Sequence, residues 1–271
     1  LIVPDPIVGD VINFVNSARP LVNAIGPRPM PSSTWHPPLV TQGTSVAVQA
    51  SAGAAADEKA EMTTQKMTIT RLDATAVTYG GYVNVSRQDI DFSQPQILDV
   101  IIEDLAARYA IQTETALGTS LDASTSTNVG YGASPTAATI RAALWSAQGT
   151  IYTATGGRGR VILALSAGRL PVFGPLFAPI VGVAANNEGL SASDVAAGLI
   201  GSISGIPVYF SPGLGTNKAF LFSTGAVEVY EQRVGQLQAV EPSVLGVQVA
   251  YAGYFTPLRL VDNGIIELTA T

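Results

Sequence analysis

The sequence contains no cysteine and only one histidine, His36. Without cysteine there can be no disulfide bonds, thiolate zinc sites, iron–sulfur clusters or cysteine nucleophiles. A single histidine also excludes metal sites that need two imidazole ligands. The composition therefore predicts no metal, redox or other cofactor.

Charge is scarce as well, since 13% of the residues are Asp, Glu, Lys or Arg, against about 25% in an average soluble domain. The 14 basic residues are outnumbered by 20 acidic ones, so tight binding to phosphates by counterion release is not expected. No continuous apolar run reaches the length of about 20 residues that a membrane-spanning helix needs. The best uncharged window, Leu170–Asn187, is interrupted by prolines and glycines and is predicted to be a loop.

Motifs for catalysis or nucleotide binding are also missing. The chain has no G-x-x-x-x-G-K-[ST], G-x-S-x-G or H-E-x-x-H string. The glycine-rich stretch Gly156–Arg160 precedes a predicted strand instead of opening a helix, so it lacks the geometry of a phosphate loop. His36 stands before two prolines, and a packing or interface role is predicted for it. The sequence therefore predicts no enzyme.

Proline is abundant at the beginning of the chain, where residues 1–43 hold eight of the 17 prolines. This density excludes a continuous helix or a central strand and predicts an extended arm, in which Val8–Val15 could form a short helix. An arm has no core of its own, so it must lie on the rest of the chain or on a neighbour.

A long β-hairpin is predicted next. Thr44–Gln49 alternates in polarity, Ala50–Ala56 is a stretch of small residues, and Lys66–Leu72 alternates again. The β pattern continues through Ala76–Val85.

The clearest helical pattern begins at Ser93, which forms a capping box with Gln96. Apolar residues then recur with the helical period up to Gly118, which is predicted to end a helix of about six turns. Asp104 and Arg108 are four residues apart and should form a stabilising pair on its surface.

A turn-rich connection, residues 118–135, separates this helix from the rest of the chain. A second helix is predicted from Ser134 to Gln148 with Gly149 at its end, and a third, shorter helix over Ser193–Ile200. Val161–Leu165 is wholly apolar and is predicted to be a strand buried on both sides. The class is α+β, and the remaining predicted strands are Ile206–Phe210, Ala219–Phe222, Val227–Glu231, Val244–Tyr254 and Ile265–Thr269.

The excess of apolar over charged residues has to be buried somewhere. An arm and a long hairpin are poor shapes for burying apolar area within one monomer, whereas obligate interfaces resemble a domain core. These features predict that the chain is a subunit of a large assembly.

In their order along the chain, these elements resemble the tailed-bacteriophage major capsid proteins of the Hong Kong 97 type. The arm is followed by a hairpin similar to the family's E-loop, and the long helix resembles its spine helix. The resemblance spans most of residues 44–268. It rests on Glu58-Lys59-Ala60, Val85-Ser86-Arg87-Gln88 with Asp91, Leu117-Gly118, Gly205-Ile206-Pro207-Val208, Tyr254-Phe255-Thr256-Pro257 and Ile265-Ile266.

The resemblance implies an α+β, Hong Kong 97-like capsid fold. Its parts would be the N-terminal arm 1–43, the E-loop hairpin 44–82, a peripheral domain with the spine helix at 83–129 and 217–271, and an axial domain at 130–216. It further implies a major capsid protein that self-assembles as pentamers and hexamers into an icosahedral shell around a phage double-stranded DNA genome. The protein would belong to the virion and assemble in the cytoplasm of the bacterial host.

Other partners follow from the same resemblance: a scaffold segment, a maturation protease, a portal and decoration proteins. The start at Leu1 fits removal of a scaffold segment by such a protease. Neither a membrane nor sequence-specific DNA binding is implied.

The resemblance also places charged residues of the hairpin against a neighbouring subunit, namely Asp57, Glu58, Lys59, Glu61, Lys66 and Arg71. Exposed ion pairs contribute about 0–1 kcal/mol each, so they would set register while apolar burial provides cohesion. Some family members crosslink subunits through a lysine three residues beyond this motif's lysine. Met62 occupies that position, so a covalent crosslink is not expected, although Lys59 or Lys66 could still approach an Asn.

Three alternatives stay open. An encapsulin-like compartment shell shares the fold but encloses a cargo protein. A phage-tail protein or another structural β protein is the second alternative. An enzyme without a recognised motif would depend on His36.

Overall fold

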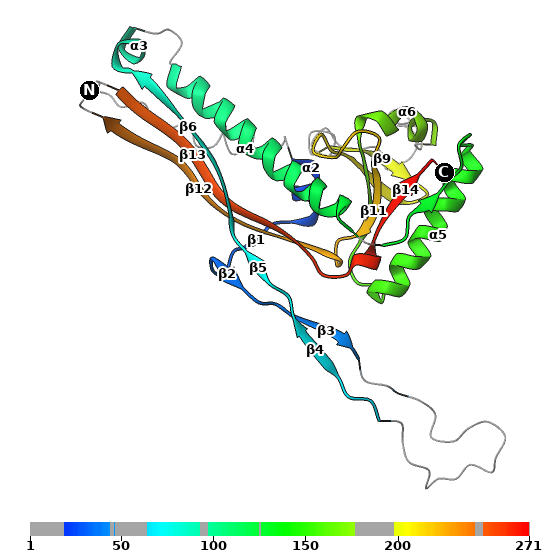
Figure 1. Ribbon diagram of the computed structural model, residues 1–271. Coiled ribbons are helices and arrows are strands. Elements are labelled where there is room, and N and C mark those ends of the chain that lie inside the picture. Colours follow the sequence, from blue (N-terminus) through cyan, green and yellow to red (C-terminus); the bar gives the residue numbers. More distant parts are fainter. Residues whose placement is uncertain are drawn as a thin grey trace, which may run out of the picture. The chain divides into compact units, whose positions relative to one another are not determined.

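The computed structural model describes residues 19–43, 46, 64–92, 97–124, 126–176, 198–241 and 246–270 (Figure 1). The chain divides into a larger unit, residues 1–30 with 76–271, and a smaller unit, residues 31–75. Helices and strands are mixed along the chain, which confirms the predicted α+β class.

A six-stranded mixed sheet forms one half of the larger unit, in the order β7-β14-β11-β8-β10-β9. Its strands are β7 (Val129–Gly130), β8 (Val161–Leu165), β9 (Leu199–Ile203), β10 (Ile206–Phe210), β11 (Ala219–Ser223) and β14 (Ile265–Thr269). Every residue of β8 is buried, as predicted, because both faces of the sheet are covered. Val161, Leu163 and Leu165 face a first core that includes the apolar stripe of α5 (Ala137–Thr155), while Ile162 and Ala164 face a second core.

A four-stranded sheet forms the other half, in the order β1-β12-β13-β6. Its strands are β1 (Arg28–Pro29), β6 (Val77–Ser86), β12 (Val227–Glu241) and β13 (Gly246–Arg259). β12 and β13 form a long antiparallel pair, and β6 is antiparallel to β13 along its whole length. The helix α4 (Ile97–Asp122) packs along one face of β6 and β13 (Figure 1), and α3 (Arg87–Phe92) joins β6 to it.

The long helix is present, but its end differs from the prediction. α4 continues through Gly118 to Asp122, so the prediction that Gly118 stops the helix is wrong. A Cβ at Gly118 would lie 2.4 Å from the carbonyl oxygen of Gly213, so this glycine serves close packing within the helix. The Asp104–Arg108 pair is present at 3.5 Å. Ser93 and Gln96 lie outside the described residues.

The second helix, α5, differs from its prediction at both ends. It begins after Thr136, which forms a capping box with Thr139, and it ends at Gly156 in the left-handed conformation. Gly149 lies within the helix, because a glycine among good helix formers weakens a helix without ending it.

Two further segments differ from prediction. The window from Leu170, predicted to be a loop, starts with α6 (Leu170–Phe173), which tolerates Pro171 in its first turn. The helix predicted over Ser193–Ile200 is replaced at Leu199 by β9, and its first residues lie outside the described ones. The remaining short elements are the 3₁₀ turns η1 (Ala167–Arg169), η2 (Gly174–Leu176) and η4 (Asp262–Gly264).

Part of the predicted extended arm folds onto the larger unit. α2 (Pro20–Ile25) is helical, and β1 pairs in parallel with Tyr230 and Glu231 of β12. Leu21 and Val22 are fully buried in the second core. Burial of these two side chains explains why the chain bends into a helix here. Val8–Val15 lies outside the described residues.

The smaller unit consists of two antiparallel ribbons. β3 (Pro38–Gln42) pairs with β4 (Thr68–Arg71), and β2 (Thr34–Trp35) pairs with β5 (Ala74–Thr75). The outgoing strand of the described ribbon lies at 38–42, within the predicted arm, while the predicted strand 44–49 lies almost wholly outside the described residues. Proline is compatible with this position because a strand in a two-stranded ribbon has one unpaired edge. The hairpin tip lies outside the described residues.

Candidate functional site

Of the six charged residues predicted to contact a neighbouring subunit, the structure describes two, Lys66 and Arg71, and both are exposed. Arg71 Nε lies 3.1 Å from Asp73 Oδ1, and His36 Nδ1 lies 2.8 Å from the same oxygen. The structure thus brings Arg71 and His36 together through Asp73, which the sequence did not single out. The other four, Asp57, Glu58, Lys59 and Glu61, lie outside the described residues, as does Met62.

A buried ionic cluster holds the arm against the larger unit. The Arg19 guanidinium donates two hydrogen bonds to Glu231 of β12, at 2.7 and 2.9 Å, and no part of the Arg19 side chain is exposed. Tyr109 of α4 donates a third hydrogen bond to Glu231 at 2.9 Å, and Arg233 Nε lies 3.2 Å from the same carboxylate. A Cβ at Gly253 would lie 2.5 Å from the Tyr109 hydroxyl, so this glycine leaves the room that the Tyr109 side chain needs.

A second buried carboxylate caps the helix of the arm. Glu114 of α4 accepts hydrogen bonds from the backbone amides of Leu21 and Val22, at 3.1 and 3.2 Å. These amides belong to the first turn of α2, where no carbonyl within the helix is available to them. Ser211 donates a hydrogen bond to the same carboxylate at 2.5 Å. Glu114 therefore ties the arm to α4 and to the segment after β10.

Burial raises the pKa of two groups in these contacts, the phenol of Tyr109 and the carboxyl of Glu114. Burial, then the charge and hydrogen bond of Glu231, raise the pKa of Tyr109 far above its ordinary range, so the phenol remains a hydrogen-bond donor. Burial also raises the pKa of Glu114 above its ordinary 4.5, although Ser211 and the amides of Leu21 and Val22 oppose the shift.

Sequence reasoning missed this cluster, although one signal was available. Glu114 shares the stripe of α4 that carries Ala110, Leu117 and Leu121, all fully buried. A carboxylate at the helical spacing of a buried apolar stripe predicts a buried partner. The identity of that partner could not be read, because Leu21, Val22 and Ser211 lie 93, 92 and 97 residues from Glu114.

Large apolar side chains are exposed on two parts of the larger unit. On the sheet, Tyr82, Ala250 and Leu237 form one cross-strand row, with Tyr82 70% and Leu237 49% exposed. On α5, Trp145 is 59% and Tyr152 47% exposed. Exposed aromatic residues with few charges around them are typical of surfaces that contact another protein.

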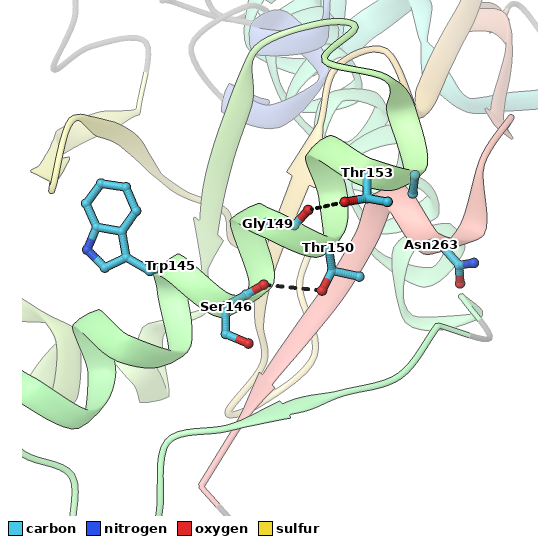
Figure 2. A pocket seen from close by; sticks show the side chains of 7 residues that line it. Trp145, Ser146, Gly149, Thr150, Thr153 and Asn263 are labelled. Carbon is cyan, nitrogen blue, oxygen red and sulfur yellow. Dashed lines mark hydrogen bonds between the residues drawn. The ribbon is translucent and has the colours of Figure 1, made fainter. Parts of the chain in front are cut away.

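A shallow hollow lies beside α5 (Figure 2). It is lined by Trp145, Ser146, Gly149, Thr150, Thr153, Ala154 and Asn263. The hydroxyls of Thr150 and Thr153 donate to helix carbonyls at 3.2 and 2.9 Å, so neither is poised as a nucleophile. The hollow contains no acid, base or cation and provides no catalytic arrangement.

Within the described part of the chain, no group of three or more His, Asp or Glu side chains is placed to hold a metal ion. None of the helices described there is long and apolar enough to span a membrane. The geometry thus offers buried anchoring contacts and exposed apolar surfaces.

Solved phage capsid structures share this fold. A chain from Mycobacterium phage Che8 gives a TM-score of 0.62 at 14% identity, covering 95% of this chain and 90% of that chain. The capsid of the native GTA particle gives 0.63 at 13% identity, with 93% and 89% covered. The capsid of the cyanophage P-SCSP1u gives 0.63 at 14% identity, with 91% and 86% covered. The fold is therefore that of phage capsid proteins.

The sequence itself gives the family. Residues 69–257 match the family described as phage capsid protein, whereas no curated protein sequence matches the chain. The chain belongs to the phage capsid protein family, and it is a structural shell protein and not an enzyme. The resemblance to tailed-phage major capsid proteins of the Hong Kong 97 type is confirmed, and an encapsulin-like compartment is not favoured.

Proposed function

We propose that the chain associates with copies of itself as pentamers and hexamers, which close an icosahedral shell around a double-stranded DNA genome. The observation that carries this proposal is the family match over residues 69–257. The capsid of the native GTA particle, which was computed with C5 symmetry, supports fivefold association in that relative. The shell would form in the cytoplasm of the bacterial host and become part of the virion.

Each part of the chain is proposed to have its own role in the shell. The arm, residues 1–43, and the E-loop hairpin, residues 44–82, would reach neighbouring subunits. The peripheral domain, residues 83–129 and 217–271, and the axial domain, residues 130–216, would form the wall. The exposed row Tyr82–Ala250–Leu237 and the exposed aromatics of α5 support burial of these surfaces against other copies.

The hairpin charges are proposed to set the register between subunits. Arg71 already forms an ion pair within its own ribbon, with Asp73. We therefore expect Arg71 and Asp73 to contact a neighbouring subunit together. Glu58 and Lys59 are the best residues for testing the proposal, because they stand near the predicted hairpin tip. Replacing either by Gln should lower the yield of particles, whereas Glu103→Gln, an exposed change on α4, should not.

The contents and the other partners follow from the same proposal. A net charge of -6 supports a wall that repels packed DNA weakly and binds no particular sequence. A scaffold segment, a maturation protease, a portal and decoration proteins are proposed as further partners of the shell.

Expression of the full chain tests the proposal directly. We expect closed shells of uniform size by negative-stain microscopy and a fast-sedimenting species in velocity centrifugation. A well-folded, monodisperse 28 kDa monomer at high protein concentration would reject self-assembly. Denaturing gels of the particles should show only the 28 kDa species, because Met62 occupies the position of the crosslinking lysine.

A further inference from the structure

Most contacts within the rest of the larger unit do not depend on the arm. Glu231 keeps two partners, Tyr109 and Arg233, even when Arg19 is removed. The strands of both sheets make their backbone ladders independently of α2, apart from the two-residue pairing of β1 with β12. The rest of the larger unit therefore keeps these contacts when the segment Arg19–Ile25 detaches.

The arm, in contrast, depends on the larger unit. α2 has six residues, and a helix this short is not stable alone. Its N-cap residue, Arg19, makes no side-chain capping bond, and the carboxylate of Glu114 takes over that role from α4. The buried side chains of Leu21 and Val22 add apolar contacts to the second core.

One donor of the cluster is left over. Within the described residues nothing accepts a hydrogen bond from Arg19 Nε, although the atom is buried. An unpaired buried donor opposes burial of the guanidinium, so the cluster holds the arm less firmly than its number of bonds suggests.

We propose that Arg19 and Glu114 are positioning residues of a latch that fixes where the arm leaves the subunit and lets the segment Arg19–Ile25 detach as one unit. The latch joins the arm to α4 through Glu114 and to β12 through Glu231, so it fixes the position of Arg19, where the described part of the arm begins. This inference rests on the proposed shell function, because the position of that residue limits which neighbouring copy the arm can reach.

Hydrogen exchange of the unassembled full chain tests the latch. Arg19→Met removes the arm's partner and leaves Glu231 paired. We expect the amides of residues 21–26 to exchange about tenfold faster or more, because the segment opens locally more often. Amides of β8 should change less than about twofold. Glu114→Gln should accelerate the amides of Leu21 and Val22, because an amide side chain replaces the carboxylate that both donate to.

Arg28→Met is the matched control. Arg28 also pairs with a glutamate of β12, Glu228, but its side chain is 59% exposed, so exchange at residues 21–26 should stay at the wild-type rate. Unchanged exchange at Leu21 and Val22 in both Arg19→Met and Glu114→Gln overturns the latch. An equal rise at β8 also overturns it, because the arm would then not open separately.

Particle assembly tests the consequence. Arg19→Met should give fewer or less uniform particles than Arg28→Met. If Arg19→Met opens the arm yet assembles like the wild type, the latch has no role in directing the arm, and that part of the proposal is wrong. Failure of the wild-type chain to form shells would instead reject the proposed function, while the exchange data would still decide whether the latch exists.

Discussion

Two glycines inside helices should respond in opposite directions to the same substitution. Gly118 lies in α4 and Gly149 in α5, and alanine is about 1 kcal/mol more favourable than glycine in a helix interior. Propensity alone therefore predicts that both Gly118→Ala and Gly149→Ala stabilise the protein. The atoms around each glycine decide whether alanine in fact raises the free energy of unfolding.

At Gly118 the gain is lost. The new methyl group would lie 2.4 Å from the carbonyl oxygen and 3.0 Å from the carbonyl carbon of Gly213. Overpacking of this kind costs about 1–3 kcal/mol. The displaced segment also carries Ser211, whose hydrogen bond to Glu114 adds about 1 kcal/mol. We expect a net loss of about 1–3 kcal/mol in the free energy of unfolding.

At Gly149 nothing lies within 4 Å of the added methyl group, and the residue is exposed. We expect Gly149→Ala to gain about 0.5–1 kcal/mol. Urea unfolding of the unassembled full chain, followed by far-UV circular dichroism, gives both values. Because propensity is common to both changes, their difference of about 2–4 kcal/mol reports the contact with Gly213. Equal stability of the two variants would refute the argument.

Three further changes test the core, the buried carboxylate and a surface pair. Leu163→Ala in β8, at a fully buried position, should lower the free energy of unfolding by about 2–5 kcal/mol in urea titrations. Because burial raises the pKa of Glu114, its contribution to stability is present at acid pH and is lost as pH rises from about 4.5 through the raised pKa. The stability difference between wild type and Glu114→Gln should therefore decline over that range in a pH series, and a constant difference would contradict the sign. Lys218 bridges Asp122 and Glu267 at 2.6 and 3.0 Å near the surface, so Lys218→Met should cost only about 0–1 kcal/mol.

The positions of the short strands could largely be predicted from local sequence, whereas the long β12 runs to Glu241, beyond the predicted Val227–Glu231, and β13 runs to Arg259, beyond the predicted Val244–Tyr254. β10 and β14 occupy the residues predicted for them, and β11 extends one residue further. These strands are short apolar or alternating runs between turn residues, so their boundaries are set by neighbouring residues. The apolar stripe of α5, with Ile140 and Leu144, was predicted for the same reason.

The errors occur where distant residues determine the local structure. Gly118 stays helical because Gly213 packs against it, and α2 forms because Glu114 caps it. β3 forms at Pro38–Gln42, within the predicted extended arm, because Thr68–Arg71 pairs with it. Sequence periodicity reports only contacts within a few residues, so none of these pairings could be predicted from it.

The composition shows that charged residues are few, but it could not show where in the fold they are buried or missing. Three of the charged residues, Arg19, Glu114 and Glu231, are buried in the contacts that hold the arm. The ten residues of β6 include no charged residue, and the 19 residues of α5 include one, Arg141. β6 forms an edge of its sheet in the described structure, and a long uncharged edge is prone to pair with another chain. Because charged residues are depleted at the centre of interfaces, these two elements are where a shell subunit gains most by being covered.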